Sequence, residues 1–190
     1  PQRVAAFGAA RIQGLQRGGV AACAKHVPGL GPVPKDPHKH LPTVQLDWPA
    51  MRTIHLVPFI AAIQAGVATI MSSHVCYPTL DPTPKMPATF SSRLMRGLLR
   101  GELGFQGVVL SDDLEMGALR ELCSVGEAAV RAVEAGHDVL LICSNLEAQR
   151  EVFDALREAY RQGRLPPLEL KRSVERIDRL KEKFSNTKSP

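Results

Sequence analysis

Two imidazoles, an ammonium group and a carboxylate fall within fourteen residues of one another in the first quarter of the chain. Lys25 and His26 come first, and Asp36 and His38 follow in a segment rich in glycine and proline. The pattern of residues 20–26 predicts a short buried strand, with Lys25 and His26 at its carboxyl end. Polar side chains at the carboxyl ends of parallel strands, followed by functional loops, form the active sites of α/β barrels. The segment is therefore a candidate catalytic loop.

A second group of candidate residues lies about 75 residues further on. Residues 108–110 predict an apolar strand, and the adjacent carboxylates of Asp112 and Asp113 follow at its carboxyl end. An acid or nucleophile at this point and a histidine in the upstream loop would form a catalytic pair. The alternative is that Ser111 or Asp113 only caps the next helix.

The composition is that of one soluble globular unit. The chain has 190 residues, of which 44% are hydrophobic and 23% charged. No apolar run approaches the ~18 residues of a membrane span, and no signal peptide opens the chain. The four cysteines, Cys23, Cys76, Cys123 and Cys143, have no C-x-x-C spacing. Because Cys23 and Cys143 fall within predicted buried strands, we expect free thiols and a cytoplasmic location.

The net charge of +5 raises the possibility of a nucleic-acid partner. However, the basic residues alternate with acidic ones along helical segments, which is typical of a solvated helix face. Two tyrosines and one tryptophan offer few platforms for stacking bases. We therefore expect neither a nucleic-acid nor a membrane partner.

Helical and strand patterns alternate along the chain. Helical patterns occupy residues 2–17, 48–65, 90–103, 126–135, 146–162 and 168–184, and strand patterns occupy residues 20–26, 67–71, 107–110 and 138–143. Pro58 is expected to kink or divide the second helix, and residues 117–122 predict a loop or a short turn. Helices between successive strands predict parallel βα units, and the unbroken apolar strands predict burial on both faces.

Four βα units are half of an eight-stranded barrel, which typically needs ~250 residues. The predicted fold is therefore α/β, a partial (β/α)8 TIM barrel made of about its last four βα units. Residues 1–190 would form the carboxyl-terminal part of the barrel domain, with the amino-terminal half absent. An open doubly wound sheet is the alternative, although no G-x-G-x-x-G turn follows a strand.

Three spaced motifs resemble those of the family-3 glycoside hydrolases, in particular the bacterial β-N-acetylglucosaminidases of peptidoglycan recycling. The family pattern Lys-His-Phe-Pro-Gly-His-Gly, four residues, Asp-Ser-His is matched in length and at seven positions by residues 25–38. The pattern G-[FY]-x-G-x-V-x-S-D-D-L-x-M is matched by residues 104–116, and [AS]-H-V by residues 73–75. The resemblance covers essentially the whole chain.

The resemblance implies a retaining exo-β-N-acetylglucosaminidase that acts on muropeptides derived from peptidoglycan. Asp112 matches the nucleophile, which forms a covalent glycosyl–aspartate intermediate. His38 matches the acid/base, and Asp36 matches its hydrogen-bonded partner in a dyad. A retaining glycosidase needs these two roles, and a histidine with a pKa near 6.5 can both give and take a proton near neutral pH.

The remaining candidates would bind the sugar. Lys25 and His26 match residues that hold sugar hydroxyls, and a lysine at a buried strand end is costly unless its charge has a partner or ligand. His74 is a third candidate for substrate binding, with a buried core histidine as the alternative. We expect no cofactor and no metal. The partner would be a muropeptide or another glycan that contains N-acetylglucosamine.

The chain departs from the family pattern at three positions of the loop. Val27 replaces an aromatic residue, Leu30 a histidine, and Pro37 the serine between Asp36 and His38. Because proline fixes φ and lacks a backbone donor, the loop is expected to be stiffer than in relatives. In relatives the amino-terminal half supplies an aspartate and an arginine that hold the sugar. The isolated chain is therefore expected to be inactive or only marginally folded.

Two other readings remain open. Asp36, His38 and His40 have a D-x-H-x-H spacing that could bind zinc in a metal-dependent hydrolase, although such ligands normally lie at strand ends. The chain could also be a truncated fragment without enzymatic activity. The sequence does not decide between water and phosphate as the acceptor, and it leaves the aglycone and the oligomeric state open.

Overall fold

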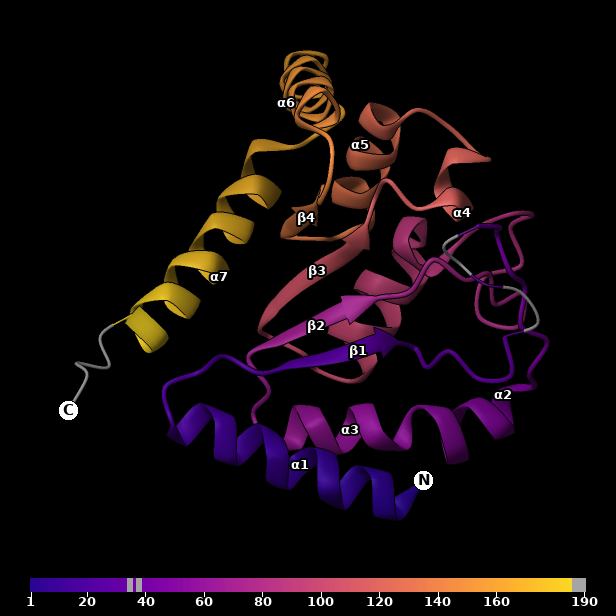
Figure 1. Ribbon diagram of the computed structural model, residues 1–190, viewed down its shortest axis with the longest axis vertical. Coiled ribbons are helices and arrows are strands. Elements are labelled where there is room, and N and C mark those ends of the chain that lie inside the picture. The colour runs from indigo at the N-terminus through magenta and orange to yellow at the C-terminus, as the bar shows by residue number, and fades with distance from the viewer. Residues whose placement is uncertain (34–35, 37–38, 186–190) are drawn as a thin grey trace.

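The computed structural model describes residues 1–33, 36 and 39–185. Its centre is a parallel sheet with the strand order β1-β2-β3-β4 (Figure 1). The strands are β1 (Cys23–Val27), β2 (Thr69–Ser72), β3 (Val108–Asp113) and β4 (Val139–Leu141). Each strand pairs with the next one along the chain, so the order of these strands does not reverse as it would in a doubly wound sheet.

Helices surround the sheet and follow the strands in alternation (Figure 1). The long helices are α1 (Gln2–Arg17), α3 (Val57–Gln64), α5 (Val125–Ala135), α6 (Leu146–Arg161) and α7 (Pro167–Ser185). Helix α1 packs against α3, and α5 packs against α6. In the part of the chain that the structure describes, no helix is both long enough and apolar enough to cross a bilayer.

The predicted helix at residues 48–65 is divided, as Pro58 indicated. It consists of α2 (Trp48–Ala50), the π-helix η1 (Met51–His55) and α3, and Pro58 lies in the first turn of α3. A proline is tolerated there because the first backbone N–H groups of a helix have no partner within the helix.

The next predicted helix is also irregular. A short 3-10 helix, η2 (Ala88–Phe90), precedes the π-helix η3 (Arg93–Glu102). The short turn expected at residues 117–122 is α4 (Gly117–Arg120).

The main core lies between the sheet and the helices α1, α3 and η3. The two central strands are largely buried, with Ile70 of β2 and Val109 of β3 both 0% exposed. A second core cluster, which includes Leu119 and Ala129, packs around α4 and α5. Burial is therefore concentrated around the two middle strands.

The expectation that all four strands are buried on both faces is wrong for the two edge strands. Residues of β1 alternate between exposed and partly buried before Val27, and all of β4 is only partly buried. Cys23 and Cys143 are exposed, and Cys143 lies just beyond β4 rather than within it. The physical reason is that each edge strand has a neighbouring strand on one side only. All four cysteines are free thiols.

Asp138 joins the sheet to two helices at the amino end of β4. Its carboxylate is 0% exposed and accepts hydrogen bonds from Arg100 of η3 at 2.7 Å and from Arg176 of α7 at 2.7 and 3.0 Å. It also accepts a hydrogen bond from the backbone N–H of Val109 at 2.9 Å. A buried carboxylate needs such partners, because its desolvation would otherwise cost several kcal/mol.

Candidate active site

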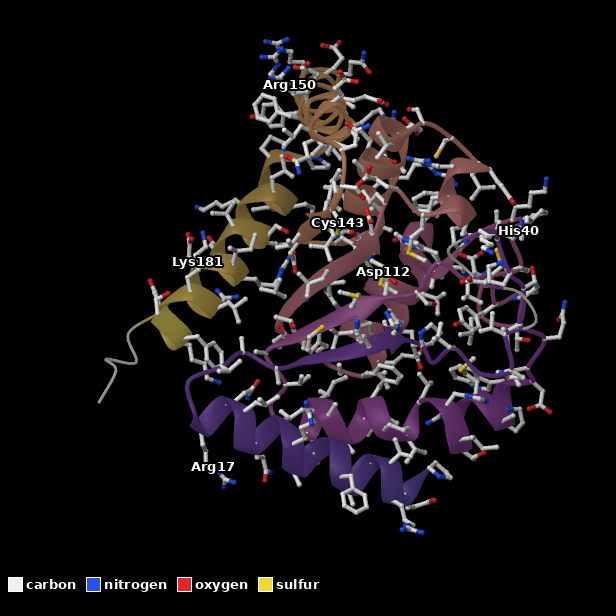
Figure 2. All side chains as sticks on the ribbon, viewed as in Figure 1. Arg17, His40, Asp112, Cys143, Arg150 and Lys181 are labelled. Atoms are coloured by element: carbon white, nitrogen blue, oxygen red, sulfur yellow. The ribbon has the colours of Figure 1, made fainter. Side chains whose placement is uncertain are left out.

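The candidate side chains come from the carboxyl ends of three strands that lie in sequence across the sheet. His26 is the residue before the last in β1, His74 lies two residues after β2, and Asp112 and Asp113 are the last residues of β3. Because the strands are parallel, these ends lie at one edge of the sheet, where Figure 2 shows Asp112. The edge is the position at which α/β barrels carry their catalytic residues.

The structure brings His26 and Asp112 together across the end of β2. Nε2 of His26 lies 3.3 Å from Oδ2 of Asp112, and their side chains are 22% and 25% exposed. The other carboxylate oxygen, Oδ1, accepts a hydrogen bond from the backbone N–H of Asp113 at 2.9 Å. Both oxygens therefore have a partner in the protein, which fixes the orientation of a carboxylate that solvent can still reach.

His74 lies behind this pair and is only 1% exposed. Its Nδ1 is 2.7 Å from Oγ1 of Thr89, and its Nε2 is 3.0 Å from the carbonyl oxygen of Asp113. Burial lowers the pKa of His74, so the ring is neutral near pH 7. A neutral ring can donate from Nε2 to the carbonyl, which supports the end of β3.

The first part of the candidate loop is tied to the segment after β2. The hydroxyl of Tyr77 donates to the carbonyl oxygen of Gly29 at 3.0 Å and lies 3.1 Å from Oγ of Ser73. Gly29 has a φ of +117°, and a Cβ there would lie 3.2 Å from Cβ of His55. This position therefore favours glycine both in conformation and in space. Burial raises the pKa of Tyr77, which keeps its donor proton in place.

The far part of the loop is tied to the segment that follows β3. Nδ1 of His40 lies 2.9 Å from Oε1 of Glu121, and the backbone N–H of Leu41 donates to Oε2 of Glu121 at 3.4 Å. Glu121 is the residue after α4, in the same connection that begins with Asp112. The loop is thus held on both sides of the predicted acid/base position.

The predicted acid/base itself, His38, lies outside the described residues, as do residues 34, 35 and 37. Asp36 is described within the loop, and its pairing with His38 remains a prediction. The zinc reading depends on the same histidine and remains untested. Its third member, His40, is paired with Glu121.

Lys25 is exposed on the edge strand β1. Among the described residues it forms no ion pair with Asp112, and it lines part of a cavity of about 200 Å³ between α1, α3 and β1. The expected buried position of this lysine is therefore wrong, because β1 has no neighbour on that side. Its role in sugar binding remains a prediction.

The sequence did not single out three buried residues that support the site. Thr89 contacts His74, and Ser72 joins Thr89 to His137, with distances of 3.2 Å from Ser72 Oγ to Thr89 Oγ1 and 2.8 Å to His137 Nε2. His137 lies just before β4, outside the three family motifs, so no motif marks it as functional. No local pattern could identify Thr89, because its contacts depend on where the proline-rich segment lies in space.

Comparison with known proteins shows the family of the chain. The family model described as "Glycosyl hydrolase family 3 N terminal domain" matches residues 1–180. The chain belongs to glycoside hydrolase family 3. The predicted family and the α/β class are thereby confirmed.

Among its curated relatives are β-hexosaminidases of Nitrosomonas eutropha and Stenotrophomonas maltophilia. The first is 38% identical over 157 residues, which are 83% of this chain and 44% of the relative. The second, from strain K279a, is 43% identical over 143 residues, or 75% of this chain and 42% of the relative. The chain therefore spans less than half the length of these relatives.

A solved structure of a family-3 β-N-acetylglucosaminidase from Paenibacillus sp. str. FPU-7 is also similar. It matches with a TM-score of 0.94 and 42% identity, over 98% of this chain and 35% of that chain. The parallel strands and surrounding helices are thus those of the family-3 N-terminal domain.

The buried His137 leads to a prediction about stability and pH. Burial lowers its pKa from 6.5 to about 4, so between these values the unfolded chain binds a proton that the folded chain does not. The free energy of unfolding should therefore fall by up to about 3 kcal/mol as the pH drops from about 6.5 to about 4. Urea unfolding at several pH values measures this.

The matched variants are His137→Gln and His55→Gln. His137→Gln should be less stable at pH 7 but lose less stability on acidification, because the titrating group is gone. His55→Gln, at a partly exposed position, should keep the pH dependence of the wild type. An unchanged slope in His137→Gln would contradict the assignment.

Proposed function

We propose that this chain carries the catalytic residues of a retaining exo-β-N-acetylglucosaminidase. The substrate would be a muropeptide derived from peptidoglycan, from which the enzyme removes a terminal N-acetylglucosamine. The main support is the carboxylate of Asp112, which is oriented at the end of β3 by His26 and by the N–H of Asp113 and is still 25% exposed. The β-hexosaminidase names of the relatives support the same class of substrate.

In the proposed reaction, an oxygen of Asp112 attacks the anomeric carbon and forms a glycosyl ester. The bond from that carbon to the leaving oxygen breaks, and His38 gives a proton to the leaving oxygen. In the second step His38 takes a proton from water, which attacks the same carbon and releases Asp112. The hydrogen bond from the backbone N–H of Asp113 to Asp112 holds the nucleophile in position through both steps, which lowers the entropic cost of the reaction.

Asp36 is proposed to orient His38 in a dyad, and the ties at Gly29 and Glu121 hold the loop that carries both. Water is the proposed acceptor.

Lys25 and His26 are proposed to bind sugar hydroxyls. His26 is well placed, since its ring is partly exposed beside Asp112. Contact of His74 with the sugar stays a prediction, and its burial and its bond to the carbonyl of Asp113 favour support of the β3 end. The four free thiols support a reducing, cytoplasmic location, which we include in the proposal.

We also propose that the chain works as one half of a closed barrel, with four further βα units between β4 and β1. Apolar side chains are exposed on the helices beside both edge strands, with Phe7 of α1 at 72%, Phe153 of α6 at 65% and Val174 of α7 at 54%. A cavity of about 670 Å³ lies between β4, α6 and α7. Large apolar surfaces of this kind normally contact another part of a protein.

This second proposal predicts a difference between the chain alone and a completed barrel. The chain alone should not release the fluorophore from 4-methylumbelliferyl β-N-acetylglucosaminide. A fusion to the part of the Nitrosomonas eutropha relative that precedes its matched residues should do so. Equal turnover by both forms would contradict the need for a second half, and inactivity of both would count against the glycosidase assignment.

The role of Asp112 is tested in the active form by Asp112→Asn. Loss of the nucleophile should lower kcat by about a thousandfold or more. Asp113→Asn is the matched control, since it changes the adjacent carboxylate of the same strand and should cost less than about tenfold. A fluorinated glycoside that slows the second step should add its sugar mass to the peptide that contains Asp112. Labelling of another peptide would refute the assignment.

The role of His38 is tested by His38→Ala with two kinds of substrate. Turnover of an alkyl or disaccharide substrate should fall much more than turnover of a nitrophenyl substrate, because a good leaving group departs without a proton. The ratio of the two kcat/KM values measures the effect and makes each variant its own control. Equal losses on both substrates would contradict the acid role.

A further inference from the structure

A chain of buried polar side chains runs beneath the candidate site from β4 to the end of β3. Its members are Ser72, His74, Thr89 and His137, which are at most 2% exposed. Ser72 ends β2 and His74 lies two residues after it. Thr89 lies in η2, and His137 follows Gly136. Buried polar groups are almost always hydrogen-bonded, and each of these four side chains has a partner in the protein.

The two ends of this chain are carbonyl oxygens, which can only accept hydrogen bonds. Nδ1 of His137 lies 3.0 Å from the carbonyl oxygen of Ala132, and Nε2 of His74 lies 3.0 Å from that of Asp113. These two ring nitrogens therefore carry the protons. Burial lowers the pKa of both histidines, so each ring is neutral near pH 7 and its other nitrogen is an acceptor.

Each of these acceptor nitrogens has one hydroxyl beside it. Nε2 of His137 lies 2.8 Å from Oγ of Ser72, so the single hydroxyl proton of Ser72 is used there. Nδ1 of His74 lies 2.7 Å from Oγ1 of Thr89. The other neighbours of Oγ1 are further away, with the carbonyl oxygen of Ser73 at 3.0 Å and Oγ of Ser72 at 3.2 Å. Because Nδ1 of the neutral His74 is an acceptor and lies nearest, the hydroxyl of Thr89 donates to it, and the carbonyl oxygen of Ser73 at 3.0 Å is a second acceptor of the same proton.

A different proton arrangement would oppose two acceptors. If Thr89 donated to the carbonyl of Ser73 instead, Nδ1 of a neutral His74 would have to carry the ring proton. Its bare Nε2 would then face the carbonyl oxygen of Asp113 at 3.0 Å. A buried pair of acceptors without a proton between them destabilises the folded state.

We propose that Thr89 is a positioning residue for the nucleophile. Its hydroxyl fixes the tautomer of His74, His74 holds the carbonyl of Asp113, and the N–H of the same residue holds Oδ1 of Asp112. This inference rests on the proposed role of Asp112 as the nucleophile. Thr89 affects the reaction only through His74 and Asp113, and it does not touch the sugar.

The first test detects the hydrogen bond between Thr89 and His74 by NMR, and it does not need an active enzyme. In the chain labelled with 15N-histidine, long-range proton–nitrogen NMR at pH 7 should show His74 with its proton on Nε2. Thr89→Val keeps the shape but removes the hydroxyl, so the Nδ1 resonance should move to the value of a nitrogen without a donor. Thr89→Ser should keep the wild-type resonance. A protonated Nδ1 in the wild type, or an unmoved resonance in Thr89→Val, would overturn the proposal.

The second test measures kinetics in the active form. Thr89→Val should lower kcat about tenfold to a hundredfold with little change in KM, since a misplaced nucleophile affects the reaction more than binding. Thr89→Ser should restore kcat. Thr69→Val is the matched control, because it makes the same change at a buried hydroxyl of β2 that donates to the carbonyl oxygen of Ala22, outside this network, and its kcat should stay within about threefold of the wild type.

The outcomes separate this inference from the proposed function. If the wild type is active and Thr89→Val keeps its kcat, or if Thr69→Val loses as much as Thr89→Val, the positioning role is refuted. If neither the chain nor the completed barrel is active but the NMR result holds, the proposed function fails and the hydrogen bond stands. Should Thr89→Val not fold, Thr89→Ala replaces it in both tests, and the wild-type spectrum alone overturns the proposal if Nδ1 of His74 carries the proton.

Discussion

The site depends on the parallel register of three strands. Cys23 of β1 pairs with Thr69 of β2, and Thr69 pairs with Val108 of β3, so the three strands end at nearly the same level. Adjacent strands are about 4.8 Å apart, and His26 must therefore reach across the end of β2 to meet Asp112. A register slip of one residue would turn every side chain of a strand to the opposite face and separate this pair. The burial of β2 and β3 thus maintains the active-site geometry as well as the stability of the sheet.

Sequence reasoning was most successful where a feature is encoded locally. The helices at residues 2–17 and 126–135 were predicted to within one residue, because glycines mark their ends and Ser124 caps the second. The position of candidate residues at strand ends followed from the parallel topology. The exposure of β1 and β4 could not be predicted, since an apolar strand has the same composition at the centre and at the edge of a sheet. Thr89 was missed because its partners lie 15 or more residues away.

The two contacts that hold the candidate loop differ in burial. At Gly29 the donor is the hydroxyl of Tyr77, which is 1% exposed. At the other contact, the side chains of His40 and Glu121 are 58% and 47% exposed. Exposed ion pairs contribute only about 0–1 kcal/mol, and salt weakens them further. The described part of the loop beside the sheet is thus held by a buried hydrogen bond, and the described part beside α4 is held by an exposed one.

The carboxylate of Asp138 has a consequence for how the protein is made. Its two arginine partners come from Arg100, 38 residues before it, and from Arg176, 38 residues after it. While the polypeptide is being synthesised, the strands β1 to β4 are made with the first guanidinium already present, but the second is added only after α6 and the first half of α7 have followed. Domains tend to fold as units during translation. Among the described strands, the amino end of β4 is accordingly the last to reach its final electrostatic balance.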